Sequence, residues 1–387
     1  MIVAYCLANY FFWSSIKKAH LQINNVFVYV YWALLLLYPL SIYLTYSSLI
    51  STRFSENMSF NRSTDEIASI VLQTASIALI TFAFCLRNFP IIRESNVYCS
   101  VPKVKKSIIL YVIFFPIAFY YNLNSNWSTG EGAESASMAA YMRNILTVLS
   151  VAIFLTKSIK QKWKLLVLLL FMVVTFVSTQ RTNALILIVA FVYNMKPTKK
   201  TMMFIIAGIV ALLVLGSIRN GEDFTNLLYP IFGEGLLGSH GLVQAIEYTS
   251  SKGYSISQFF MLFNGSINWF LDIVRIGGNL PTFEDLISSS GRIYYPMGGF
   301  FYLSDAYLMH PILGPIVYTL LIFWIYRKSV NTFYRIHSPL SLICLSLLFD
   351  TVKGSLATFT ALIVFHYLFY YLLNMRQKGK NESSLIV

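Results

Sequence analysis

Long apolar segments separated by short basic clusters recur along the whole chain, and this pattern limits the folds that it can adopt. Of its residues, 57% are hydrophobic and 12% are charged, whereas soluble domains carry about 25% charged residues. A soluble core could not bury so much apolar surface, but lipid accepts it where each backbone segment satisfies its own hydrogen bonds. The pattern therefore predicts an all-α polytopic membrane protein.

Eleven segments approach the roughly 20 apolar residues that a membrane-spanning helix needs. The expected spans are 2–16, 23–48, 67–86, 107–123, 139–156, 165–178, 183–195, 201–218, 304–326, 338–352 and 355–375. The shorter ones are permissible where a helix is buried in protein or where the bilayer thins. We expect a single integral membrane domain over residues 1–387 with about 11 transmembrane helices.

Lysine and arginine gather in alternate loops between these segments. One set of loops holds twenty of them, in the clusters at 17–18, 87–106, 157–164, 196–200, 327–335 and 376–380. The short loops of the other set hold only Arg53, Arg62, Arg181 and Lys353. Because cytoplasmic loops carry the excess of basic residues, the N-terminus is expected outside and the C-terminus in the cytoplasm.

One external loop, near 219–300, is far longer than the others, and a loop of this length is usually functional or disordered. Within it, Ser239 to Gly253 is expected to form a capped helix that ends at Lys252-Gly253. Phe259 to Val274 is apolar but interrupted by Asn264-Gly265-Ser266, and Arg275 follows it. We interpret it as an interfacial or re-entrant element rather than a span.

The net charge of +13 does not indicate nucleic-acid binding, because the basic residues lie in short clusters between apolar runs. The four cysteines form no CxxC pair and are interpreted as small buried side chains. No cleavable signal peptide is evident. The chain has no DxD pair, Walker loop, GxSxG, HExxH or Cys/His cluster, so we expect neither a metal nor another cofactor.

Arginines on the expected outer side are the first candidates for chemistry. Arg181 lies in a tight turn between two short apolar helices, Arg219 ends a span, and Arg275 and Arg292 lie in the long loop. Each is an interfacial arginine whose side chain reaches lipid headgroups, or part of a phosphate clamp. Guanidinium groups suit the second role because they bind phosphate in a bidentate manner and keep their charge.

A histidine and several acidic residues are the next candidates. His240 is the only histidine in an external loop and suits a general base, although a capping role is an alternative and Glu234 and Glu247 compete with it. Asp305 lies where the long loop re-enters the membrane, where it orients an arginine or a sugar hydroxyl, or begins a helix. Arg143 lies inside the fifth span and needs a partner that the sequence does not reveal.

Four features of this chain resemble the Wzy family of O-antigen and oligosaccharide repeat-unit polymerases. The first is the number of spans together with one dominant external loop in the second half. The others are the Ser178-Thr-Gln-Arg181-Thr-Asn turn between basic-flanked apolar segments, the span ending Ser217-Ile-Arg219, and the return from the loop through Pro296-Met-Gly-Gly-Phe to Gly314. The topological likeness covers most of the chain.

The resemblance implies a GT-C-like, metal-independent glycosyltransferase of the bacterial inner membrane. Its donor is a glycan on undecaprenyl pyrophosphate, its acceptor a repeat unit on the same lipid, and its protein partner a chain-length regulator of the Wzz type. Arg181 and Arg219 are then the pyrophosphate clamp with Arg292 assisting, and His240 is the base. Trp269, Tyr294 and Tyr295 stack on sugar faces or anchor the chain in the membrane.

Three alternatives remain open at this point. An O-antigen ligase uses the same donor with a lipid A-core acceptor, and the expected architecture barely separates it from a polymerase. A repeat-unit flippase would show paired halves and charged residues at mid-membrane depth. No two-fold repeat is visible in the sequence. A polyprenyl-phosphate-dependent glycosyltransferase would carry its catalytic acid in the first external loop, which holds Asp65 and Glu66.

Overall fold

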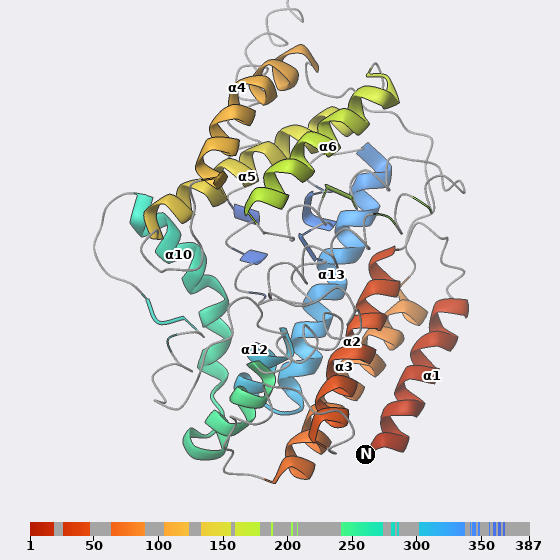
Figure 1. Ribbon diagram of the computed structural model, residues 1–387. Helices are drawn as coiled ribbons and strands as arrows, with labels where there is room; N and C mark the ends of the chain where they lie inside the picture. Colours follow the sequence, from red (N-terminus) through yellow and green to blue (C-terminus); the bar gives the residue numbers. More distant parts are fainter. Residues whose placement is uncertain are drawn as a thin grey trace, which may run out of the picture. The chain divides into compact units, whose positions relative to one another are not determined.

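The described part of the protein is almost entirely helical. The computed structural model describes residues 1–18, 26–46, 63–89, 104–123, 133–155, 159–178, 187–188, 203, 207, 241–273, 280–282, 285, 302–336, 341, 343–345, 347–348, 356, 359–360, 363–364 and 367. None of these residues is in a strand. The helical fold class is therefore confirmed for the described residues, and Figure 1 shows the arrangement of their helices.

Six of the expected spans coincide with helices. These are α1 (Ile2–Lys18), α2 (Val26–Tyr46), α3 (Thr64–Asn88), α4 (Val104–Leu123), α5 (Ala133–Leu155) and α6 (Gln161–Ser178). Among the described residues, two helices are long and apolar enough to cross a membrane, through Phe27–Leu44 in α2 and through Thr64–Asn88 in α3. The expected spans at 183–195, 201–218, 338–352 and 355–375 lie mostly outside the described residues.

The chain divides into two compact units. The first contains Met1–Ile91, Thr225–Lys328 and Leu348–Leu362, and the second contains the remaining segments, Ile92–Phe224, Ser329–Leu347 and Ile363–Val387. Both units are built from segments that are distant in the sequence. The long expected external loop therefore belongs mainly to the same unit as the N-terminal helices.

In the first unit, α1 and α2 are antiparallel, whereas α1 and α3 run in the same direction. The Tyr5 hydroxyl of α1 donates to the carbonyl of Leu35 in α2 at 2.5 Å, and Trp32 Nε1 donates to Asn9 Oδ1 at 3.1 Å. At the other end of α1, Arg87 of α3 donates to the hydroxyl of Ser15 at 2.7 Å. Alternating directions of this kind are expected of successive membrane helices joined by short loops.

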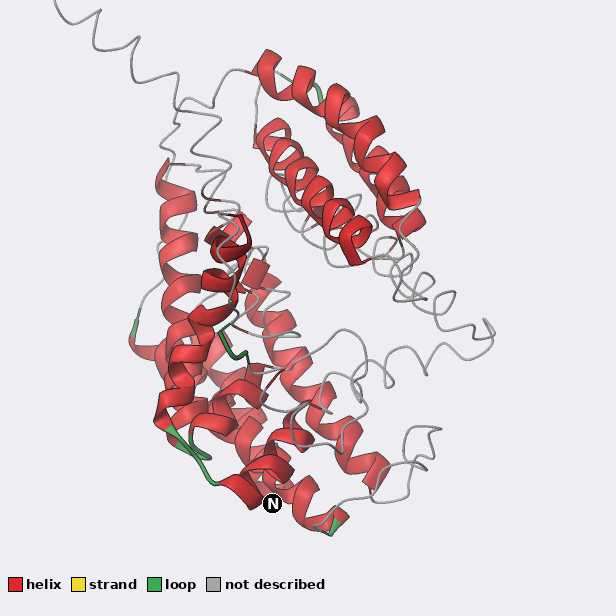
Figure 2. Cartoon of the chain, turned by 90° about the vertical axis from the view of Figure 1, so that its left-hand side faces the viewer, coloured by secondary structure: helices red, strands yellow, loops and turns green. Residues whose placement is uncertain are grey.

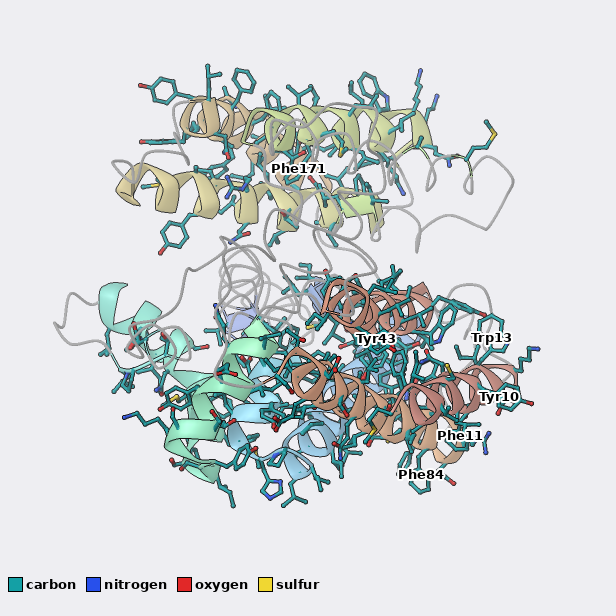
Figure 3. The ribbon with its side chains drawn as sticks, turned by 60° about the horizontal axis from the view of Figure 1, so that its bottom comes forward. Tyr10, Phe11, Trp13, Tyr43, Phe84 and Phe171 are labelled. Atoms are coloured by element: carbon teal, nitrogen blue, oxygen red, sulfur yellow. The ribbon has the colours of Figure 1, made fainter. Side chains whose placement is uncertain are left out.

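An aromatic cluster joins these helices to α13 (Leu313–Ile336). The ring of Phe82 stacks on Tyr31 with centroids 4.3 Å apart, and meets Phe323 of α13 edge to face at 5.2 Å. Phe27 stacks on Tyr326 at 4.9 Å. All five rings are buried, so this cluster forms the core of the first unit. Two residues from Phe82, the ring of Phe84 is 58% exposed on the outside of α3 (Figure 3).

The second unit brings α4, α5 and α6 together. The Tyr111 hydroxyl of α4 donates to the carbonyl of Val167 in α6 at 3.1 Å. Near the other end of α4, Asn122 Nδ2 donates to the carbonyl of Ala139 in α5 at 3.5 Å. Lys164 Nζ, at the start of α6, donates to the carbonyl of Phe154 at the end of α5 at 2.5 Å. Figure 2 shows these helices beside one another from a second direction.

The expected single span over 304–326 is wrong, because the chain turns sharply in the middle of it. The short helix α12 (Tyr302–Met309) ends before His310-Pro311, and α13 begins at Leu313. Pro311 lacks the N–H that would continue the helix. Tyr302 and Thr319, which flank the turn, lie side by side with their hydroxyl oxygens 3.3 Å apart. The two helices therefore form a hairpin, and α13 alone has the length of a span.

The capped helix predicted at 239–253 is confirmed over its described part. Residues 241–252 are helical, and Leu242, Val243 and Ile246 are fully buried. Gly253 adopts φ +77°, and its N–H donates to the carbonyl of Thr249 at 2.9 Å. This is the left-handed glycine that commonly ends a helix. Ser239, the predicted N-cap, lies outside the described residues.

Candidate functional site

Most of the predicted site lies outside the part of the chain that the structure describes. The undescribed residues are Arg181, Arg219, Arg275, Arg292, His240, Tyr294 and Tyr295. Trp269 lies within α10 (Met261–Ile273), but its side chain is not described. Of the predicted site residues, only Asp305 can be described with its surroundings.

Asp305 is fully buried in α12, all of whose residues are buried. Its Oδ2 accepts a hydrogen bond from the backbone N–H of Leu356 at 3.2 Å. A buried carboxylate is costly unless it accepts hydrogen bonds, and backbone N–H groups are suitable donors. In this conformation Asp305 connects α12 to the segment expected to begin the eleventh span, and its side chain does not reach solvent.

Buried hydroxyl groups surround the α12–α13 hairpin. The hydroxyl of Tyr31 lies 2.7 Å from that of Tyr302, which in turn lies 3.3 Å from Thr319 Oγ1. Tyr318 lies within electrostatic reach of Asp305, and its buried hydroxyl has no hydrogen-bond partner among the described residues. The sequence did not reveal this cluster, because its members come from helices far apart in the chain and each looks like an ordinary aromatic of a span.

His310 forms the corner between the two helices. Its Nδ1 accepts the backbone N–H of Ile312 at 3.1 Å and that of Leu313 at 3.2 Å. Through these two bonds the imidazole caps the start of α13. Tyr254 and Tyr307 meet beside it with their hydroxyl oxygens 3.1 Å apart.

Asn122 is one partner of Arg143, whose position inside an apolar segment was expected to require a partner. Arg143 lies in α5 and is 4% exposed, and its guanidinium donates to Asn122 Oδ1 of α4. Asn122 Nδ2 is in turn fixed by the carbonyl of Ala118 at 2.7 Å. Residues 21 positions apart meet because α4 and α5 are antiparallel. A polar residue near the end of an apolar segment was the only sequence signal for Asn122.

Among the described residues, no group of three or more histidine, cysteine, aspartate or glutamate side chains could hold a metal ion. Comparison with known proteins adds no assignment to this geometry: no family model, no curated protein and no solved structure matches the chain.

Proposed function

We propose that this chain is an O-antigen polymerase of the bacterial inner membrane. It would join oligosaccharide repeat units carried on undecaprenyl pyrophosphate at the outer face of that membrane. The proposal combines the resemblance described above with the expected distribution of charge. It treats the chain as a multi-pass protein with its N-terminus outside and its C-terminus in the cytoplasm.

The distribution of cations in the first unit is the observation that supports this orientation best. Arg87 bonds to Ser14 and Ser15 at the end of α1, and Arg327 of α13 stacks on Phe89 at 5.5 Å. The C-terminal ends of α1 and α3 and the part of α13 that carries Arg327 therefore share one basic end, as the positive-inside rule requires of a cytoplasmic side.

The opposite end of the unit holds Tyr254 and η1 (Ile256–Phe260) of the long loop. There, Tyr254 and Phe259 contact the corner and first turns of the α12–α13 hairpin, with Tyr254 6.1 Å from His310 and Phe259 6.0 Å from Tyr318. If the basic end is cytoplasmic, this end faces outward. The loop that carries Arg219 and His240 in the sequence would then border the outer face, where a lipid-linked glycan is available.

The chemistry requires stabilisation of a departing pyrophosphate. The acceptor hydroxyl would form a bond to the anomeric carbon of the donor, the bond from that carbon to the pyrophosphate oxygen would break, and a base would take the hydroxyl proton. Fixed arginines stabilise the developing negative charge without reorganisation. We assign this role to Arg181 and Arg219 with Arg292 assisting, and the base to His240. The buried position of Asp305 favours a role in holding the hairpin.

The experiment that tests the proposal compares lipopolysaccharide in a deletion strain complemented with variants. Arg181→Ala and Arg219→Ala should abolish the ladder of long O-antigen chains while a single ligated repeat unit remains. Arg53→Ala and Arg62→Ala are matched controls, since both are arginines of an expected outer loop outside the clamp. The abundance of each variant in membranes is measured in parallel.

The possible results separate the polymerase from its nearest alternative. A full ladder from both clamp variants, at normal protein abundance, would overturn the assignment of the clamp. Loss of the single ligated unit on deletion, with lipid-linked polymer accumulating, would identify a ligase instead. Replacement of Asp65 and Glu66 tests the remaining enzyme alternative, which requires an acid in the first external loop.

A further inference from the structure

One face of the segment from Ile256 to Phe270 carries a continuous apolar stripe. Its members are Ile256, Phe260, Phe263, Ile267 and Phe270, and their side chains are 42–67% exposed. Phe263, Ile267 and Phe270 recur at intervals of four and three residues, which places them on one side of α10. Ile256 and Phe260 precede them in η1 (Ile256–Phe260). A contiguous exposed apolar patch is uncommon on a soluble surface and indicates an apolar partner.

The side of α10 next to the stripe is held by hydrogen bonds. Asn264 Nδ2 donates to the carbonyl of Pro281 at 2.6 Å, and Asn268 exchanges two bonds of 2.8 Å with the backbone of Leu280. Thr360 Oγ1 donates to the carbonyl of Leu262 at 2.6 Å. Rotating the helix to bury the stripe would break these bonds. The stripe therefore stays on the outside of the unit.

The direction of α10 distinguishes between the two interpretations that the sequence left open. Its N-terminal end lies at the hairpin corner, as the contact of Phe259 with Tyr318 shows. From there α10 and α13 both rise in Figure 1, away from the hairpin corner, and they diverge from each other. The 13 residues of α10 extend about 20 Å along this direction. An interfacial helix would instead lie across the end of the bundle.

After α10 the chain turns back along the same helix. Leu280 and Pro281 lie beside Asn268 and Asn264, in the reverse order of the helix. Thr282 and Asp285 then form reciprocal capping bonds: the N–H of Thr282 donates to Asp285 Oδ2 at 2.8 Å, and the N–H of Asp285 to Thr282 Oγ1 at 3.3 Å. Backbone that is not helical is tolerated at membrane depth only in protein or beside water.

We infer that η1, α10 and the returning residues Leu280, Pro281, Thr282 and Asp285 form a re-entrant hairpin in the bilayer, with the apolar stripe against lipid acyl chains. The exposed side chains of Leu280 and Asp285 then stay in contact with water. This inference rests on the membrane location in the proposed function. Lipid suits the stripe better than a protein partner does, because the stripe has no polar group to specify one. Leu313, Leu320 and Trp324 form a similar exposed apolar face on α13.

Spin labels on the full-length protein in nanodiscs of phosphatidylethanolamine and phosphatidylglycerol test the inference. The four native cysteines are replaced, and single cysteines are introduced as Phe263→Cys, Ile267→Cys and Phe270→Cys on the stripe. Leu320→Cys is the lipid control and Ser250→Cys the aqueous control, since both parent side chains are exposed. Collisions of each label with oxygen, which partitions into lipid, and with a water-soluble nickel chelate are measured. Leu280→Cys and Asp285→Cys report on the return segment.

The expected result is loss of nickel collisions at all three stripe positions, as at Leu320, with nickel collisions retained at 280 and 285. Nickel collisions at the stripe, with Leu320 in lipid, would overturn the hairpin and leave the membrane protein and its proposed activity intact. Stripe labels reached by neither reagent would also overturn it and indicate a protein partner. Nickel collisions at Leu320 would reject the membrane location itself, whereas the polymerase assignment fails separately, on the lipopolysaccharide ladder.

Discussion

Gly314 in the first turn of α13 lies directly against the carbonyl group of Ala306 in α12. A β-carbon on Gly314 would stand 1.7 Å from that carbonyl oxygen. The obstructing atom belongs to the backbone of a fully buried helix, so it has no rotamer by which to move away. This close approach determines how tightly the hairpin closes, and Pro315 follows in the first turn, where proline is tolerated.

Replacing Gly314 with alanine should therefore separate α12 from α13. We expect Gly314→Ala to destabilise the protein by about 3 kcal/mol, the upper part of the usual range for overpacking. Thermal unfolding in detergent measures the loss. Leu313→Ala is the control, because the neighbouring Leu313 is 49% exposed and should shift the transition little. Equal effects of the two changes would contradict the close approach.

The end of the 241–252 helix depends on a second glycine for a different reason. Gly253 has open space around it but a φ of +77°, which costs other residues about 1–2 kcal/mol. We expect Gly253→Ala to increase hydrogen exchange in the last turn of this helix, and Gly253→Asn to have a smaller effect, since asparagine tolerates the conformation. Lys252→Ala, one position earlier, should leave exchange unchanged. Similar protection in all three variants would show that the glycine is not required.

Removing the acceptor of the buried Arg143 should destabilise the second unit. We expect Asn122→Ala to cost about 1.5–3 kcal/mol, as is typical of a hydrogen bond to a charged group. Adding Arg143→Met to Asn122→Ala should restore part of the lost stability, because the double variant no longer buries a charged side chain. The four proteins of this cycle are compared by thermal unfolding in detergent. Additive losses would show that the two residues do not interact energetically.

The aromatic core of the first unit predicts opposite results for two phenylalanines on α3. Phe82 is fully buried among Tyr31, Phe12 and Phe323, whereas Phe84 faces outward. Phe82→Ala should cost about 3–5 kcal/mol, as usual when a buried ring leaves a cavity. Phe84→Ala should cost far less. Midpoints of unfolding in detergent provide the comparison, and the reverse order would contradict the packing of α3.

Local features of the helices could be predicted because they depend on neighbouring residues. Mainly apolar runs indicated α1 to α6, and Lys252-Gly253 indicated the end of the 241–252 helix. The same reasoning was wrong at 304–326, where hydropathy continues through His310-Pro311 although the backbone turns. An apolar average gives no information about whether a proline bends a helix slightly or reverses the chain.

The sequence by itself therefore determined the helical class, most helix boundaries in the described part and the chemical types available for a site. Tertiary structure alone decided which distant side chains meet: Asn122 with Arg143, Tyr31 with Tyr302, and Asp305 with the backbone of Leu356. It also decided that α10 starts beside the α12–α13 hairpin with its stripe exposed. The physical reason is that helix formation follows from local spacing, whereas the pairing of buried polar groups depends on helix direction and register, which no single segment contains.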